Sequence, residues 1–165
     1  MISVQDLFLK VIKQDENAHG TTYNSATVDI FNLAGVAAKC LFVVAVGTNT
    51  DNFTALKLQG SNADNGSDWE DVDGSVVGTD LDVNGNVSTL PDTTFTNKNI
   101  AWTVNTNSGA YRYYRLVATA DSAGTSCHFA FFVLLGQRGN VALTQDIATG
   151  VTELLCVPPV IPTTH

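Results

Sequence analysis

The sequence is poor in charged residues, and basic residues are its scarcest charged class. Only 15% of the 165 residues are Asp, Glu, Lys or Arg, and eight Lys and Arg stand against sixteen Asp and Glu. The formal net charge of -8 argues against partners such as nucleic acid or an anionic membrane surface. Hydrophobic residues make up 44% of the chain, which is enough for one core in a domain of ordinary size. The low charge content favours a surface that is partly covered by a protein partner.

Cysteines and long apolar runs are also scarce. Cys40, Cys127 and Cys156 form an odd, widely spaced set, which predicts folding in a reducing cytoplasm rather than a disulfide scaffold. Cys40 and Cys127 lie in the most apolar segments, so we expect buried, unreactive thiols. The longest apolar run, residues 129–135, is far shorter than the roughly 20 residues that span a bilayer. No charged segment followed by an apolar one comes after Met1, so we expect no signal peptide.

Motifs that carry common enzyme chemistry are missing. The sequence has no Gly-x-Ser-x-Gly elbow, no Cys-x-x-Cys pair and no glycine-rich phosphate loop. His19 lies in a polar turn, His128 in an apolar segment, and His165 is the last residue. Residues 80–85 begin like a calcium-binding loop, but Pro91 occupies the position that should supply a bidentate glutamate. We therefore predict no enzyme activity, no cofactor and no metal ligands.

Patterns typical of β-strands dominate the chain. We expect strands at residues 26–33, 39–47, 54–61, 69–77, 99–105, 111–120 and 127–137. Residues 39–47 and 127–137 are apolar on both faces, as central strands are. Stretches rich in Asn, Asp, Gly and Ser between the strands predict turns. This spacing predicts an all-β single domain, an antiparallel β-sandwich or jelly-roll-like fold, with its core in residues 26–139.

An acid-rich stretch, SNADNGSDWEDVDGS, follows the expected strand at residues 54–61. Its residue types predict an exposed hairpin turn in which Gly66 is free to adopt a positive φ. We expect Trp69 to return the chain to the sheet and to cap the core. The other tryptophan, Trp102, lies on the apolar face of residues 99–105.

Both ends of the chain are apolar, whereas a free domain usually ends in polar, frayed residues. The spacing in residues 1–25 fits a helix or a strand, and we favour a strand or extended arm because the other expected elements are strands. The prolines in residues 140–165 predict an extended arm that loses little entropy on docking. We expect at least one arm to pack on a neighbouring subunit or a partner. The candidate contact residues are Leu7, Phe8, Val11, Val151, Leu154, Leu155, Val157, Pro158 and Pro159.

Four short motifs occur in a characteristic order: LKLQGS, DWEDVDGSVVG, YRYYRLVATA and VLLGQRG. This order resembles a group of small tailed-phage virion proteins that are often encoded near the major capsid protein. The resemblance covers roughly residues 26–139 and implies a virion structural protein, made in the host bacterial cytoplasm, that decorates or cements the head. Its implied partner is the major capsid protein, although a tail or collar component would have a similar sequence. The two-sided apolar strands also favour a homo-oligomer, most simply a trimer.

The sequence departs from that group in three places. Gly60 stands where the group often has an acid, residues 79–98 form a longer insertion, and the C-terminal arm is longer. Discoidin-like sugar-binding domains show a similar order of a polar turn, a tryptophan and a Tyr-Arg strand. The alternative is therefore a carbohydrate-binding module for host-surface glycans, with Tyr111, Tyr113 and Arg115 as its candidate residues.

Overall fold

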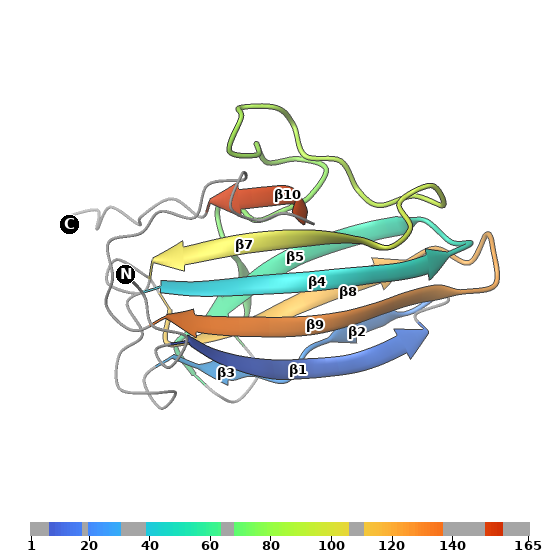
Figure 1. Ribbon diagram of the computed structural model, residues 1–165. Helices are drawn as coiled ribbons and strands as arrows, with labels where there is room; N and C mark the ends of the chain where they lie inside the picture. The colour runs from blue at the N-terminus through green and yellow to red at the C-terminus, as the bar shows by residue number, and fades with distance from the viewer. Residues whose placement is uncertain are drawn as a thin grey trace.

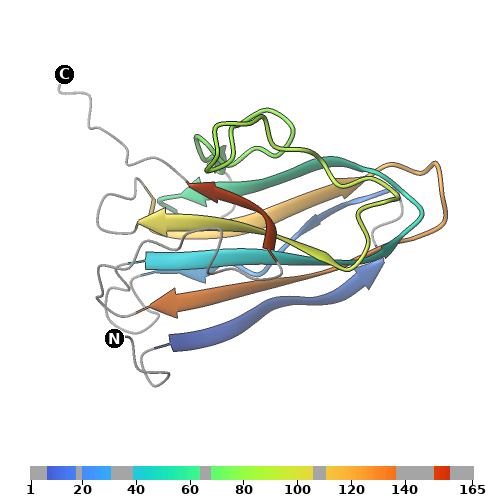
Figure 2. The ribbon, with the colours of Figure 1, turned by 45° about the horizontal axis from the view of Figure 1, so that its top comes forward.

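Two five-stranded sheets pack face to face in the computed structural model, which describes residues 7–17, 20–30, 39–63, 68–105, 111–136 and 151–156 (Figures 1 and 2). Sheet A, in front in Figure 1, runs in the order β1 (Leu7–Asn17), β9 (Cys127–Gly136), β4 (Lys39–Asn49), β7 (Lys98–Asn105) and β10 (Val151–Cys156). Sheet B runs in the order β2 (Thr22–Asn24), β8 (Tyr113–Ala120), β5 (Phe53–Ser61) and β6 (Glu70–Asp71), and β3 (Val28–Asp29) also pairs with β8. The predicted all-β sandwich is confirmed.

The pairing of sheet A explains why two of its strands are apolar on both faces. β4 is central, with β7 and β9 antiparallel on its two sides, and β1 pairs antiparallel with the far side of β9. Alternate residues of β4 point into the sandwich, and Phe42 and Val44 are fully buried there. β10 lies parallel to β7 at the opposite edge from β1. The two terminal segments that the sequence singled out as apolar therefore supply the edge strands of sheet A.

The core lies between the sheets and is centred on Trp102 of β7, whose side chain is fully buried. Its indole Nε1 donates a hydrogen bond of 2.8 Å to the backbone carbonyl oxygen of Ser75. Ser75 is itself fully buried, and its hydroxyl donates to the carbonyl oxygen of Leu58 in β5 at 3.0 Å. The segment after β6 is thus held along β5, with further backbone bonds from Val72 to Leu58 and from Val77 to Leu56.

Two crossovers between the sheets meet at one end of the sandwich. Residues 50–52 carry the chain from β4 to β5, and residues 121–126 carry it from β8 to β9. The carboxylate of Asp51, which is fully buried, accepts a hydrogen bond from the backbone N–H of Gly124. The crossovers approach so closely that a Cβ atom on Gly124 would overlap the carbonyl oxygen of Thr50. Only glycine therefore fits this position without a shift of the backbone.

Some strand limits differ from the sequence predictions. Residues 69–77 were expected to form one strand, but only Glu70–Asp71 pairs with β5 as a strand. The segment that follows turns back on itself and makes only separate backbone hydrogen bonds to β5. The strand expected at residues 26–33 is reduced to Val28–Asp29 within the described residues. The short strand β2 was not predicted, since Thr22–Asn24 is too brief to show an alternating pattern.

Candidate functional site

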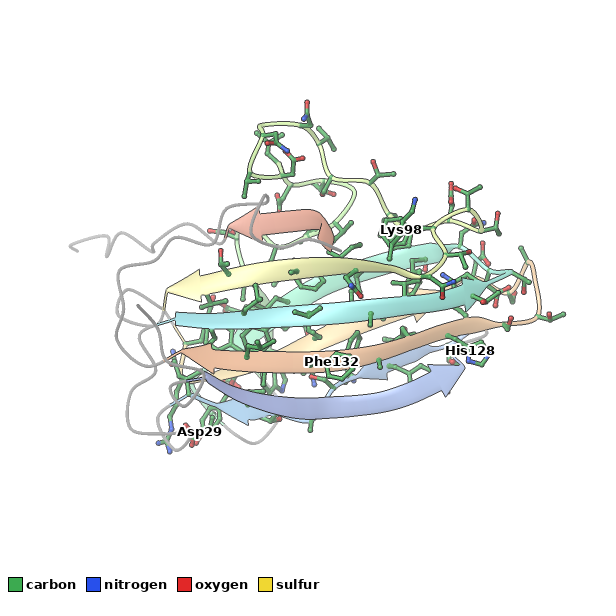
Figure 3. The ribbon with its side chains drawn as sticks, in the orientation of Figure 1. Asp29, Lys98, His128 and Phe132 are labelled. Carbon is green, nitrogen blue, oxygen red and sulfur yellow. The ribbon has the colours of Figure 1, made fainter. Side chains whose placement is uncertain are left out.

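The outer face of sheet A carries apolar side chains where a water-facing sheet usually carries polar ones. Three cross-strand pairs of β4 and β9 form what we call the apolar row: Leu41 with Leu134, Val43 with Phe132, and Ala45 with Ala130. All six are half-buried, whereas the residues between them on each strand are buried in the core. Figure 3 shows Phe132 near the middle of β9. The row is therefore a second apolar surface, separate from the core.

One end of this face is hollowed because its outward residues are small. Ala45, Gly47 and Ala130 line a shallow, open hollow of about 310 Å³ with Asn97 and Asn99, and its remaining lining residues are Val46 and Phe129. None of the lining residues is charged. We call this cavity the hollow, and it shares Ala45 and Ala130 with the apolar row.

The predicted contact residues lie mainly on the two edges of sheet A. Leu7, Phe8 and Val11 belong to β1, and Val151, Leu154 and Leu155 belong to β10. The backbone register places Val11 opposite Phe132 of the apolar row. Val157, Pro158 and Pro159 lie outside the described residues. The six described positions thus lie on the two edge strands of sheet A, with β1 next to the apolar row and β10 separated from it by β7.

Trp69 does not cap the core, and that prediction is wrong. Its ring is half-buried and lies against the guanidinium of Arg115, with 4.4 Å between Cζ and the ring centroid. Arg115 donates two hydrogen bonds to Oε1 of Gln59, from Nε at 3.0 Å and from Nη2 at 2.8 Å. Gln59 in turn donates to Asp71, which also accepts a 2.8 Å bond from Lys57. Trp69 therefore lies over a row of hydrogen-bonded polar side chains on the outer face of sheet B. The tryptophan in the core is Trp102.

The glycan-binding candidates divide into two environments. Tyr113 and Arg115 point outward from β8 on the same face as Trp69, and both are half-buried. Arg112 lies over the Tyr113 ring at 4.9 Å and forms a 2.8 Å ion pair with Asp29. Tyr113 and Trp69 are therefore the aromatic side chains on the outer face of sheet B within the described part of the chain. Each ring lies against the guanidinium of an arginine.

Tyr111, the third glycan candidate, is instead packed against the end of the core. Its hydroxyl donates a 3.0 Å hydrogen bond to Glu70, and its ring meets the ring of Tyr114 edge-on, with centroids 6.1 Å apart. A Cβ atom on Gly60 would overlap the Tyr111 ring. This contact gives a physical reason for glycine at position 60, where the phage group often has an acid.

The calcium-like segment at residues 80–85 forms a tight turn. Asp82 accepts hydrogen bonds from the backbone N–H of Asn84 at 2.8 Å and of Asn86 at 2.9 Å, and Gly85 has a φ of 80°. The bond from Asn86, followed by those from Asn84, lowers the pKa of the Asp82 carboxyl. Asp82 thus stabilises the turn as an ionised side chain.

This turn presents exposed apolar side chains. Leu81 and Val87 form an isolated antiparallel bridge, so they lie opposite each other across the turn. Leu81 is 55% exposed, Val83 39% and Val87 60%. Asp80 fixes the base of this turn. Its carboxylate accepts a hydrogen bond of 2.7 Å from the backbone N–H of Val76, and its backbone carbonyl oxygen accepts one of 2.7 Å from the Ser88 hydroxyl. We call residues 81–87 the knob.

Cys40 and Cys127 are buried free thiols, as predicted. Burial raises the pKa of Cys40 from 9.0 to about 12. Burial, together with the Asp51 and Asp121 carboxylates, raises the pKa of Cys127 to about 12. Within the described ranges, no group of three or more His, Cys, Asp or Glu side chains is placed to hold a metal ion. That part of the chain also contains no helix with the length and hydrophobicity of a membrane span.

Comparison with solved structures finds one distant likeness of note. The chain is similar to a chain from the structure titled "Bacillus endospore appendages form a novel family of disulfide-linked pili", with 9% sequence identity and a TM-score of 0.37. The match covers 80% of this chain and 89% of the other. A likeness of this size carries no functional argument. Neither a protein-family model nor a curated protein matches the sequence.

Sequence reasoning missed the hollow and the knob. The knob had a local signal, since Leu81, Val83 and Val87 alternate with polar residues in the insertion. The hollow had no local signal, because its small residues come from β4 and β9, and β7 adds Asn99 only once the fold brings these strands together.

Proposed function

We propose that the chain is a structural subunit that acts by assembling with copies of itself and with a larger particle. The observation that carries this proposal is the apolar row on the outer face of sheet A. An antiparallel sheet that faces water alternates apolar and polar residues, but here Leu41, Val43 and Phe132 face outward. The occupant of this face is a neighbouring subunit, because contiguous apolar surface of this kind is typical of protein interfaces.

The particle that we propose is the head of a tailed phage, with the chain as a decoration or cement protein. The four sequence motifs and their order support this assignment, as do the apolar terminal segments, whose described parts form the two edge strands of the sheet that carries the apolar row. In this proposal the subunit forms a homo-oligomer, most simply a trimer, and binds the major capsid protein after synthesis in the host cytoplasm. A tail or collar position would use the same surfaces.

Replacing Phe132 by lysine is expected to turn the oligomer into a monomer at micromolar concentration. The substitution puts a charge at the centre of the apolar row, where burial would remove it from water. Sedimentation velocity of the purified protein measures the change, and thermal unfolding followed by circular dichroism checks that the variant folds. Tyr113→Lys is the matched control, because it makes the same kind of change on the outer face of sheet B.

Binding to the particle is measured by co-sedimentation with purified phage heads that lack the protein. The parent and Tyr113→Lys should bind, and Phe132→Lys should bind at least about tenfold more weakly. A parent protein that stays monomeric and does not bind heads would remove the proposal. A Phe132→Lys variant that assembles like the parent would instead exclude the apolar row as the interface.

Glycan binding is a second candidate, favoured by Trp69 and Tyr113, which share the outer face of sheet B with Arg115. Aromatic rings beside a few polar side chains are the usual elements of a small-ligand site, and a sugar would need both. On a glycan array, Tyr113→Ala should abolish any consistent binding by the parent, while its sedimentation stays unchanged. An array that is silent for the parent would contradict this candidate without affecting the assembly proposal.

A further inference from the structure

The knob is a rigid apolar projection. Its turn is fixed by the two backbone bonds to Asp82 and by a 2.7 Å bond from Asp82 N–H to the Asn86 carbonyl. Single exposed aliphatic residues are common on protein surfaces, but among the described residues outside β1, β10 and the strand ends, the large hydrophobic side chains that are exposed all lie here: Leu81, Val83 and Val87. A preordered projection loses little conformational entropy when it docks, which suits it to contact.

The hollow offers a surface of matching chemistry. It is lined by small apolar residues and two asparagines, and its volume of about 310 Å³ leaves room for aliphatic side chains. None of the knob residues lines it, so the knob of one chain does not occupy its own hollow.

We propose that the knob of one copy of this chain docks in the hollow of the next copy. This inference rests on the proposed function and names a specific subunit contact within it. The hollow continues the apolar row through Ala45 and Ala130, so docking of the knob extends the interface already proposed for sheet A. The knob contact alone is smaller than the roughly 800 Å² per partner of a stable interface, so the row and the hollow act together.

The charges of the two surfaces are compatible, which matters for a chain with a net charge of -8. The knob contains the ionised Asp82 and follows Asp80, and the sequence has no Lys or Arg between Lys57 and Lys98. A second copy carries the same net negative charge, so an acidic projection meets less repulsion on an uncharged surface than on an acidic one. The lining of the hollow is uncharged, so it presents no negative side chain to the knob. Lys98, at the start of β7, does not line the hollow and lies over the Phe95 ring instead (Figure 3).

The contact is heterologous, because the knob and the hollow are different surfaces of the same chain. A heterologous contact forms a closed ring when its rotation closes, and a filament when it does not. A trimer built in this way would contain three identical contacts, each pairing one knob with one hollow.

The test uses two variants of the full chain, each with one defective surface. Leu81→Ser with Val87→Ser removes the aliphatic knob, and Ala45→Gln with Ala130→Gln fills the hollow with uncharged side chains. Each variant should associate with itself about a hundredfold more weakly than the parent in sedimentation velocity. Thr54→Gln with Thr119→Gln is the matched control for the hollow variant, since it makes similar changes on sheet B and should associate like the parent.

Mixing the two variants gives the decisive measurement. The knob variant keeps an intact hollow, and the hollow variant keeps an intact knob, so an equimolar mixture should form a 1:1 complex that neither variant forms alone. The inference is overturned if both variants assemble like the parent, in which case another segment occupies the hollow, or if the mixture stays monomeric. Either result leaves the assembly proposal standing as long as the parent associates and Phe132→Lys does not.

Discussion

Replacement of Trp102 by alanine is expected to lower the free energy of unfolding by about 3–5 kcal/mol. The side chain is fully buried between the sheets, so its removal leaves a large cavity. The substitution also removes the donor to the Ser75 carbonyl, which holds the segment after β6 along β5. Because domains of this size are stable by only about 5–15 kcal/mol, the variant should be partly unfolded at moderate temperature. Urea unfolding followed by far-ultraviolet circular dichroism measures the loss.

Trp69→Ala is the matched control for this prediction. Trp69 is half-buried on the outer face of sheet B, and its defined partner is the Arg115 guanidinium. Loss of a partly exposed cation–π contact should cost about 1 kcal/mol. Equal losses for the two tryptophans would contradict the placement of Trp102 in the core and Trp69 outside it.

Gly124→Ala is expected to destabilise the protein by about 3 kcal/mol. The new Cβ atom would overlap the carbonyl oxygen of Thr50, which belongs to the facing crossover and has no side-chain freedom with which to move away. The shift would also stretch the bond from Gly124 N–H to the buried carboxylate of Asp51. Thermal unfolding of the purified variant should show a clearly lower midpoint than that of the parent.

Gly85→Ala separates this steric effect from the general cost of replacing a glycine. No atom lies within 4 Å of a Cβ built on Gly85, but its φ of 80° is unfavourable for alanine. We expect a loss of about 1 kcal/mol from the backbone alone. If Gly85→Ala proved the more harmful change, close packing of the two crossovers would not be what limits stability at that end of the sandwich.

The alternation of residue types was sufficient to predict most strands and the sandwich class. Ile100, Trp102 and Val104 alternate with polar or small residues, and all three lie in the core. Two-sided apolar character also identified β4 and β9 as interior strands of a sheet. These features are local, because the side-chain period of a strand is fixed by its own backbone.

The sequence could not predict which strands share a sheet, because pairing in this fold joins segments that are far apart in the chain. That limit explains the error at Trp69. Its neighbours in sequence are acids and turn residues, and nothing local shows that Arg115, from β8, offers its ring a partner outside the core. The parallel pairing of β10 with β7 could not be predicted either. The prolines near β10 in the sequence favour an extended arm, and nothing local indicates which strand such an arm would pair with.

The hollow was beyond prediction for a related reason, whereas the knob was not. The hollow forms because small side chains on neighbouring strands lie next to each other, so it exists only once Ala45 of β4 lies beside Ala130 of β9. The knob is a local turn whose glycine, asparagines and aspartates are visible in the sequence. Its exposed aliphatic residues could have been taken as a contact surface directly.

The pairing order of sheet A also determines when the chain can fold during its synthesis. β4 ends at Asn49, but its partners β7 and β9 begin at Lys98 and Cys127, so its ladder cannot begin to form until more than half of the chain has been translated. The long strands that follow one another, β4 and β5, β7 and β8, and β8 and β9, lie in opposite sheets and form no hairpins. Closing such distant pairs is entropically costly and therefore slow. Until β9 leaves the ribosome, one side of a strand that is apolar on both faces lacks its partner, so we expect the nascent chain to be prone to aggregation up to that point.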